Sequence, residues 1–99
     1  MNKELTEAHE IVLSFISEGK ENAKYIKDIS SISGFSGREI KRIIQDLRRA
    51  GYPICSTTYD GIWLAKDKLE LNETIKQFES RQININETLQ SLYDIQRNL

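Results

Sequence analysis

The stretch SGREIKRIIQDLRRA, residues Ser36–Ala50, decides the fold. It opens with a serine and has a glutamate three residues later. This is the spacing of a capping box, in which Ser36 and Glu39 each bind the other's backbone N–H. Apolar residues then recur every three or four positions and predict one buried helix face. Gly51 and Pro53 mark the end of this helix. The apolar positions are Ile40, Ile43, Ile44 and Leu47.

The same stretch concentrates the positive charge of the chain. Residues 36–50 contain five Lys/Arg and two Asp/Glu, whereas the whole chain contains 14 and 15 and has a formal net charge of −1. The flanking segments are acidic: residues 1–35 have four Lys/Arg against six Asp/Glu, and residues 70–99 have three against five. A local basic face is typical of a protein that contacts DNA phosphates, although a solvated helix face has the same composition.

Two shorter helices are predicted before this stretch. Leu5–Glu18 has the spacing of an amphipathic helix, with His9 pointing outward or lying at the edge of the core. Residues 19–22 break the pattern, and residues 25–33 give a second helix. Gly34-Phe35 then forms a tight turn, as in a helix-turn-helix. The apolar positions expected to face inward in the second helix are Ile26, Ile29 and Ile32.

After Gly51 the pattern becomes that of β-strands. Residues 52–58 and 62–65 are rich in β-branched and aromatic side chains, and Tyr59-Asp60-Gly61 between them is a turn signal. A two-stranded hairpin is not stable alone in water, so this hairpin must pack on the helices. The side chains expected to face the helices are Ile54, Ile62 and Leu64.

The last third of the chain, Asp67–Leu99, has a heptad pattern of apolar residues. As a single helix it would extend about 45 Å, far beyond the small head, and its apolar seam would need a partner. The simplest partner is the same helix of a second subunit. Two shorter helices folded back on the head, the second capped by Asn86, are the alternative. The predicted dimer contacts are Leu71, Ile75, Phe78, Ile85, Leu89 and Leu92.

The predicted organisation is therefore a head of residues 1–68 and a dimerisation or interaction segment of residues 69–99. Two seam positions of that segment, Gln82 and Gln96, are polar. Glutamines there weaken the helix pairing and restrict its register.

Residues Ile11 to Ala65 resemble the winged helix-turn-helix DNA-binding domain of the biotin-repressor type and its small phage and bacterial regulatory relatives. The resemblance rests on GFSGREIKRIIQDLRRAGYPI and on a short wing that ends in GIWLA, with Ile62 where tyrosine is common. It implies a mainly α fold with a small β-hairpin, in which the helix from Ser36 lies in the major groove of DNA. The chain has no room for a ligase domain, so the resemblance implies nothing about biotin.

We expect sequence-specific binding of double-stranded DNA by a homodimer that acts as a transcriptional regulator or a phage-type replication or regulatory factor. Arginine suits guanine, glutamine suits adenine, and a helix N-terminus can hold a phosphate. The alternative is a protein-interaction module that recruits a replication or transcription partner, which the acidic flanks and the low net charge favour. The predicted DNA contacts are Ser36, Arg38, Lys41, Arg42, Gln45 and Arg49 on the helix, and Thr57, Thr58 and Tyr59 at the wing tip.

No catalytic, metal or cofactor site is predicted, so we expect a protein that is not an enzyme. His9 and Cys55 are the only residues of their types, and one chain cannot supply a His/Cys zinc site from them. Neither glycine-rich phosphate-binding motif is present. No apolar run has the length of a membrane span or the position of a signal-peptide core, and a single cysteine fits a reducing compartment. We therefore expect a cytoplasmic protein that binds no membrane.

Overall fold

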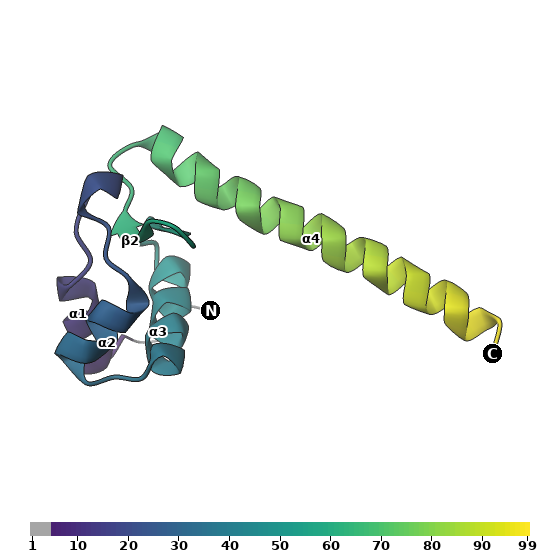
Figure 1. Ribbon diagram of the computed structural model, residues 1–99, viewed down its shortest axis with the longest axis horizontal. Helices are drawn as coiled ribbons and strands as arrows, with labels where there is room; N and C mark the ends of the chain where they lie inside the picture. Colours follow the sequence, from purple (N-terminus) through teal and green to yellow (C-terminus); the bar gives the residue numbers. More distant parts are fainter. Residues whose placement is uncertain (1–4) are drawn as a thin grey trace.

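Three short helices and a two-stranded hairpin form a head, from which one long helix projects at an angle (Figure 1). The structure is a computed structural model and describes residues 5–99. This mainly α fold with a small hairpin and a long C-terminal helix confirms the predicted fold class. The elements in chain order are α1 (Glu7–Ser14), the 3₁₀ turn η1 (Lys20–Asn22), α2 (Ile26–Ser33), α3 (Gly37–Arg49), β1 (Ile54–Thr57), β2 (Gly61–Leu64) and α4 (Lys68–Arg97).

The caps and the apolar stripe of α3 are as predicted. The N–H of Glu39 donates to Ser36 Oγ at 3.1 Å, and the N–H of Ser36 donates to Glu39 Oε1 at 3.4 Å. All four stripe residues are buried, and burial of each stabilises the fold by about 2 kcal/mol. α3 is therefore the element on which α1, α2 and the hairpin pack. The buried core consists of Val12, Ile16, Ile29, Ile40, Ile43, Ile44, Leu47, Ile54 and Ile62.

α2 ends at a glycine turn, as expected. Gly34 has a φ of 82°, and its N–H donates to the carbonyl of Ser30 at 2.9 Å. This left-handed conformation costs glycine little because glycine has no Cβ. Only part of the predicted apolar face of α2 is inside: Ile29 is buried, but Ile32 is 60% exposed. Ile32 lies in the last turn of α2, beside Gly34, where no described element covers it.

α1 is shorter than the predicted helix of residues 5–18, because the chain after Ser14 pairs with β2. The N–H of Leu64 donates to the carbonyl of Ser17 at 2.8 Å, and the N–H of Gly19 donates to the carbonyl of Leu64 at 2.9 Å. Lys24 and Ile62 exchange both backbone hydrogen bonds, at 3.0 and 2.7 Å. The segment between α1 and α2 thus occupies the edge of β2 that β1 leaves open, which its polar sequence did not indicate.

Of the two positions predicted for His9, the outward one is wrong, because His9 is buried beside the apolar core. His9 is only 6% exposed, and its Nε2 lies 2.9 Å from Oδ2 of Asp46 on α3. The N–H of Thr6 donates to Nδ1 of His9 at 3.0 Å, so Nδ1 carries no proton and Nε2 is the donor to Asp46. This hydrogen bond ties α1 to α3. A polar residue beside an apolar stripe is usually exposed, so the sequence pattern did not mark this pair.

The hairpin is buried on both faces. β1 and β2 are antiparallel, with Ile54 opposite Leu64 and Cys55 opposite Trp63. Ile54 and Ile62 belong to the helical core, whereas Cys55 and Trp63, both fully buried, alternate onto the other face. The first turns of α4 cover that second face, where Cys55 Sγ lies 3.5 Å from the carbonyl of Glu70.

α4 is one continuous helix, so the alternative of two shorter helices is wrong. Asp67 caps it by accepting from the N–H of Glu70 at 2.9 Å, and Asn86, the proposed second cap, lies inside the helix. Its first turns pack on β1, and beyond residue 74 every residue of the helix is exposed. Residues 75–82 still border the head, whereas the rest of α4 projects from it, and the molecule is 52 Å in its longest dimension.

Replacement of Gly61 by alanine is expected to destabilise the head strongly. Gly61 has a φ of 99°, and an added Cβ would overlap the carbonyl oxygen of Lys24, which accepts a β2 hydrogen bond. We expect Gly61→Ala to lower the free energy of unfolding by about 3 kcal/mol or more, measured by urea denaturation. The matched control is Gly34→Ala, because Gly34 also has a positive φ but has no atom within 4 Å of the added Cβ. It should cost only about 1 kcal/mol. Equal losses for the two variants would contradict the role given to the Lys24–Ile62 pairing.

Candidate nucleic-acid interface

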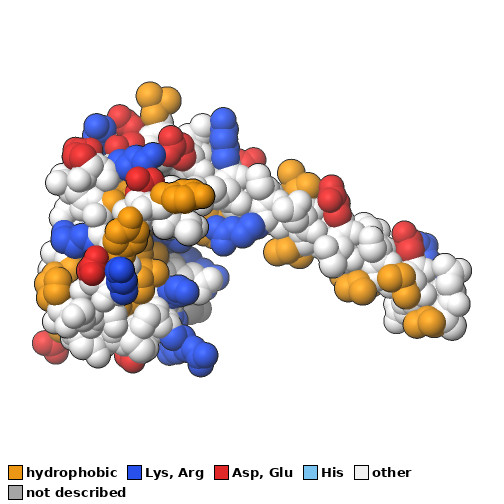
Figure 2. Space-filling view, viewed as in Figure 1, with side chains coloured by type: hydrophobic (Ala, Val, Ile, Leu, Met, Phe, Trp, Pro, Cys, Tyr) orange, Lys and Arg blue, Asp and Glu red, His pale blue; other side chains and the backbone are white. Residues whose placement is uncertain are grey.

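α3 carries a basic face on the side away from its apolar stripe. Arg38, Lys41, Arg42, Gln45 and Arg49 are all exposed. Within residues 5–99, none of these four cations forms an ion pair with a carboxylate. Lys and Arg side chains gather on the flank of the head that lies beneath α4 (Figure 2). These five predicted contacts are therefore free to meet a ligand from solvent.

Four of the predicted contacts border one shallow hollow. Its volume is about 410 Å³, and it lies between α3 and the side chain of Phe78 on α4. No carboxylate is among the residues that line it. Arg38, one turn nearer the N-terminus of α3, is outside this hollow. The lining residues are Lys41, Arg42, Gln45, Arg48, Arg49 and Phe78.

Arg48 differs from the other arginines of α3 because its guanidinium is used inside the protein. Nε donates to the carbonyl of Ile54 at 2.8 Å, and a terminal nitrogen donates to Ser56 Oγ at 3.0 Å. The guanidinium also lies over the ring of Phe78, 5.2 Å from its centroid. Burial lowers the pKa of Arg48, although an arginine remains charged at neutral pH. Arg48 thus joins α3, β1 and α4, and its role is structural.

Ser36 is engaged at the start of α3. Its hydroxyl accepts from the N–H of Glu39 and lies 3.1 Å from the Glu39 carboxylate. The carboxylate complements the positive end of the helix dipole at the place where a phosphate would bind. A phosphate contact by Ser36 stays a prediction. Such a phosphate would have to displace the Glu39 carboxylate from the Ser36 hydroxyl, or bind beside it.

The tip of the hairpin is a hydrogen-bonded turn with two exposed side chains. Thr57 Oγ1 donates to Asp60 Oδ2 at 2.7 Å and accepts from the N–H of Asp60 at 2.8 Å. The hydroxyl of Tyr25, at the start of α2, donates to the carbonyl of Tyr59. Thr58 and Tyr59 point to solvent, and Tyr59 is 88% exposed. Of the three predicted wing contacts, Thr57 therefore holds the turn while Thr58 and Tyr59 are available.

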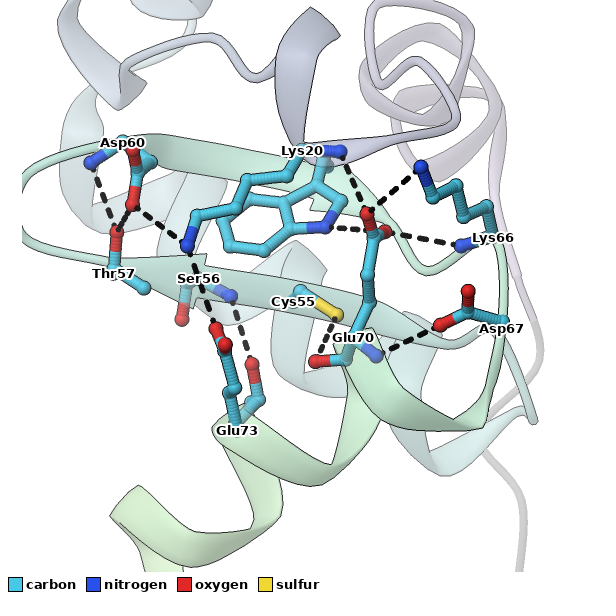
Figure 3. Close-up of polar contacts among 11 residues, drawn as sticks. Lys20, Cys55, Ser56, Thr57, Asp60, Lys66, Asp67, Glu70 and Glu73 are labelled. Carbon is cyan, nitrogen blue, oxygen red and sulfur yellow. Dashed lines mark hydrogen bonds and ion pairs between the residues drawn. The ribbon is translucent and has the colours of Figure 1, made fainter.

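The position of α4 on the hairpin depends on Glu70 (Figure 3). The indole Nε1 of Trp63 donates to Glu70 Oε1 at 3.0 Å, and the N–H of Lys66 donates to the same oxygen at 3.1 Å. The other oxygen accepts from the N–H of Lys20 at 3.3 Å. The Glu70 side chain is only 13% exposed. One carboxylate therefore joins β2, η1 and the first turn of α4.

A second contact set lies beside Glu70. The ammonium of Lys20 is 3.5 Å from a carboxylate oxygen of Glu73 and 3.7 Å from one of Asp60, and these carboxylates raise the pKa of Lys20. On the neighbouring strand, the N–H of Ser56 donates to the buried hydroxyl of Thr74 at 3.3 Å. These contacts fix α4 across the hairpin and so determine what lies on either side of it.

An open groove of about 1070 Å³ lies on one side of α4, between that helix, the hairpin and the starts of α2 and α3. Its charged residues are all cations: Lys27, Lys41, Lys76 and Arg81. Lys41 also borders the hollow beside α3, so the two depressions adjoin. Three of these cations, Lys27, Lys76 and Arg81, are isolated in the sequence, so no sequence pattern marked them and only the fold brings them to one groove.

The other side of α4 is mainly apolar, although Arg48 and Glu79 also line it. A groove of about 620 Å³ separates it from the loop before β1, and its apolar lining comes from Tyr52, Pro53 and Ile54 of the head together with seam residues of α4. A further apolar hollow of about 350 Å³ lies along the same seam toward the C-terminus. Of the predicted dimer contacts, Leu71 is half-buried and the others are exposed: Ile75, Phe78, Ile85, Leu89 and Leu92.

Among residues 5–99, no group of three or more His, Cys, Asp or Glu side chains is placed to hold a metal ion. His9 is bound to Asp46, and Cys55 lies beneath α4. Burial raises the pKa of the Cys55 thiol, while the hydroxyl of Thr74 acts in the opposite direction. No helix in the described part of the chain has the length and apolarity needed to cross a membrane. Comparisons with protein-family models, with curated proteins and with solved structures gave no match.

We expect Glu70→Gln to loosen α4 in a pH-dependent way. Burial alone would raise the pKa of Glu70, but hydrogen bonds from Lys66, Lys20 and Trp63 outweigh it and lower that pKa below the ordinary 4.5. A carboxylate with a lowered pKa stabilises the folded state above about pH 4.5, and this stabilisation is lost as the pH falls through the folded-state pKa. The variant should melt several degrees lower than the parent at pH 7, and this difference should shrink by pH 3, as measured by circular dichroism.

The control is Glu87→Gln, which removes an exposed carboxylate farther along α4. Its melting temperature should follow that of the parent at every pH. If the deficit of Glu70→Gln were the same at pH 3 as at pH 7, the charge of Glu70 would not be the stabilising feature.

Proposed function

We propose that this protein binds double-stranded DNA in a sequence-specific manner, through a winged helix-turn-helix head whose α3 enters the major groove. The observation that carries the proposal is the outward face of α3, with its four exposed cations that have no carboxylate partner within residues 5–99. α2, the glycine turn and α3 follow one another as in a helix-turn-helix, where the second helix reads the bases. The hairpin follows in the position of a wing.

The residue types on α3 suit both kinds of DNA contact. Arg38, Arg42 and Gln45 have the planar donor and acceptor groups that recognise guanine and adenine edges. Lys41 and Arg49 suit phosphates, which contribute affinity and orientation without sequence information. Thr58 and Tyr59 at the wing tip would then lie against the sugar-phosphate backbone. The tip itself carries no Lys or Arg, so its contribution to affinity is small.

The second part of the proposal is a homodimer through the seam of α4. The seam residues project from the head with exposed apolar side chains, which soluble helices normally bury against a partner. The two polar seam residues, Gln82 and Gln96, occupy equivalent heptad positions. In a parallel, in-register pair each glutamine faces its own counterpart and can hydrogen-bond to it. In an antiparallel pair, each glutamine faces an apolar position instead, so we propose the parallel arrangement.

A parallel dimer places two heads at the same end of a two-fold axis, and its DNA site would be an inverted repeat. These properties fit a transcriptional regulator or a phage-type replication or regulatory factor that acts in the cytoplasm without catalysing a reaction. The competing function is a protein-interaction module, favoured by the exposed seam of α4. In that case, the seam would bind a different protein and the basic face of α3 would be only a solvated surface.

The double variant Lys41→Ala/Arg42→Ala is expected to lose DNA binding. For a footprint of about six phosphates, the parent should lose roughly 10³-fold in affinity between 50 and 200 mM salt. The variant should bind at least about tenfold more weakly at low salt, and its salt dependence should be less steep. Fluorescence anisotropy with duplexes selected from a random pool measures both quantities.

The charge-matched control is Lys68→Ala/Arg97→Ala. It removes two exposed cations of α4 that line none of the hollows described above. This control should bind like the parent. If the Lys41/Arg42 variant bound DNA as tightly as this control, the proposed DNA-binding face would be wrong.

The variant Ile85→Asp is expected to convert the dimer to a monomer. Ile85 is a seam residue that is 66% exposed in the single chain, so the substitution leaves the fold of the head intact while it puts a charge into the interface. Ile83→Asp is the matched control, because Ile83 is 58% exposed but lies off the seam. Light scattering should give the monomer mass for the first variant and the dimer mass for the second and for the parent. A parent that is monomeric at concentrations of about 100 μM would exclude the dimer as the active form.

A further inference from the structure

We infer that α4 is a second DNA-binding element, and that Lys76 and Arg81 bind backbone phosphates in the groove between α4 and the head. This inference rests on the proposed DNA binding. It adds a site that lies outside the base-reading face of α3 and outside the wing tip. The ligand is the phosphodiester backbone of the same duplex.

The charge of the groove is the first argument. The chain as a whole has a net charge of −1, yet the groove is lined by four cations and no Asp or Glu. The cations come from three helices: Lys27 from α2, Lys41 from α3, and Lys76 and Arg81 from α4. Like charges that face one another across a groove repel, and this repulsion destabilises the folded protein. A bound anion attracts each of the cations and so stabilises it. The fold thus concentrates positive charge where the sequence does not.

The availability of these cations is the second argument. Within residues 5–99, none of the four forms an ion pair. Two of them are positioned by aromatic rings: the Arg81 guanidinium lies 4.4 Å from the centroid of Phe78, and Lys27 Nζ lies 5.8 Å from that of Tyr25. Contact with a ring face limits the motion of a long side chain and leaves its donors free. The groove is therefore partly organised for an anion before any ligand binds.

The shape of the basic surface favours a polymer over a small anion. Lys41 borders both the groove of about 1070 Å³ and the hollow of about 410 Å³ that contains Arg42, Gln45 and Arg49. A DNA strand that contacts α3 can therefore continue past Lys41 into the groove and remain beside positively charged side chains throughout. This continuity is the reason for assigning the groove to the duplex that α3 binds, and not to a separate acidic protein.

The groove and the proposed dimer use different faces of α4. At about 100° per residue, Lys76, Gln77 and Ser80 lie on the side of the helix away from the seam of Ile75, Phe78 and Gln82. Arg81 lies at the border between the two faces, where its guanidinium contacts the ring of Phe78. A second subunit can therefore occupy the seam while DNA occupies the groove. The long helix would then orient each head on DNA as well as join the two heads.

The test compares Lys76→Gln/Arg81→Gln with the parent, the Lys41/Arg42 variant and the Lys68/Arg97 control in the full chain. The probes are the selected duplex and a random duplex of equal length. Loss of two phosphate contacts should reduce the slope of log affinity against log salt by about 2 and weaken binding to both duplexes roughly tenfold. The preference for the selected duplex should not change, because phosphates carry no sequence information. Arg81→Lys, which keeps the charge, should retain the parental slope.

Two results would overturn the inference. If Lys76→Gln/Arg81→Gln had the parental slope while Lys41→Ala/Arg42→Ala lost binding, α3 would still bind DNA and the groove would not. If neither variant changed DNA affinity, the proposed function and this inference would both be wrong. Circular dichroism would verify the fold of each variant, and both groove residues are exposed, so their replacement leaves the core intact.

A second measurement locates the DNA directly. Ser80 lines the groove, and the native cysteine, Cys55, is buried, so an iron chelate can be attached selectively to a Ser80→Cys variant. Hydroxyl radicals from this chelate should cleave both strands of the selected duplex within a few nucleotides of the site. Cleavage no stronger than that from a chelate at a Glu87→Cys position, farther along α4, would count against DNA in the groove.

Discussion

The hydrogen bond from the indole of Trp63 to the carboxylate of Glu70 is the contact on which the arrangement of the molecule depends. Trp63 is fully buried on the hairpin face that the head helices do not cover. The first turns of α4 cover that face together with Lys20 of η1, whose Nζ lies 5.9 Å from the centroid of the indole ring, and Glu70 satisfies the indole N–H. The backbone N–H groups of Lys20 and Lys66 bind the same carboxylate. These contacts of Glu70 fix the direction of α4 and therefore the position of the grooves beside it.

Because of this junction, α4 meets three different environments around its circumference. Thr74 and Glu70 face the hairpin, Lys76 and Arg81 border the basic groove, and the seam around Ile75 borders the apolar groove. Here the first two turns bind the head, and the next two separate a cationic surface from an apolar one. In the proposed function, DNA binding and dimerisation are therefore coupled through this one helix.

Charge segregation in α3 has a simple physical origin. Its apolar stripe is fully buried, so the remaining positions must face solvent, and most of them are Lys, Arg or Gln. Asp46 and Arg48 lie beside the stripe and yet make contacts inside the protein. Asp46 accepts the hydrogen bond of buried His9, and Arg48 donates to the carbonyl of Ile54. Polar residues beside an apolar stripe can face either way, and only their partners, distant in sequence, determine which.

Local sequence patterns were sufficient to predict the elements whose formation depends on neighbouring residues. The sequence by itself determined α3 with its Ser36–Glu39 cap, the glycine turn before it, the hairpin and the heptad character of the tail, because each depends on residues within about one heptad. Only the tertiary structure decided that α4 is continuous, that His9 is buried, that residues 17–24 pair with β2 and that four scattered cations line one groove. The last three features join segments far apart in the chain, so no local pattern of propensity or charge can encode them. The continuity of α4 was one of two arrangements that the heptad pattern left open.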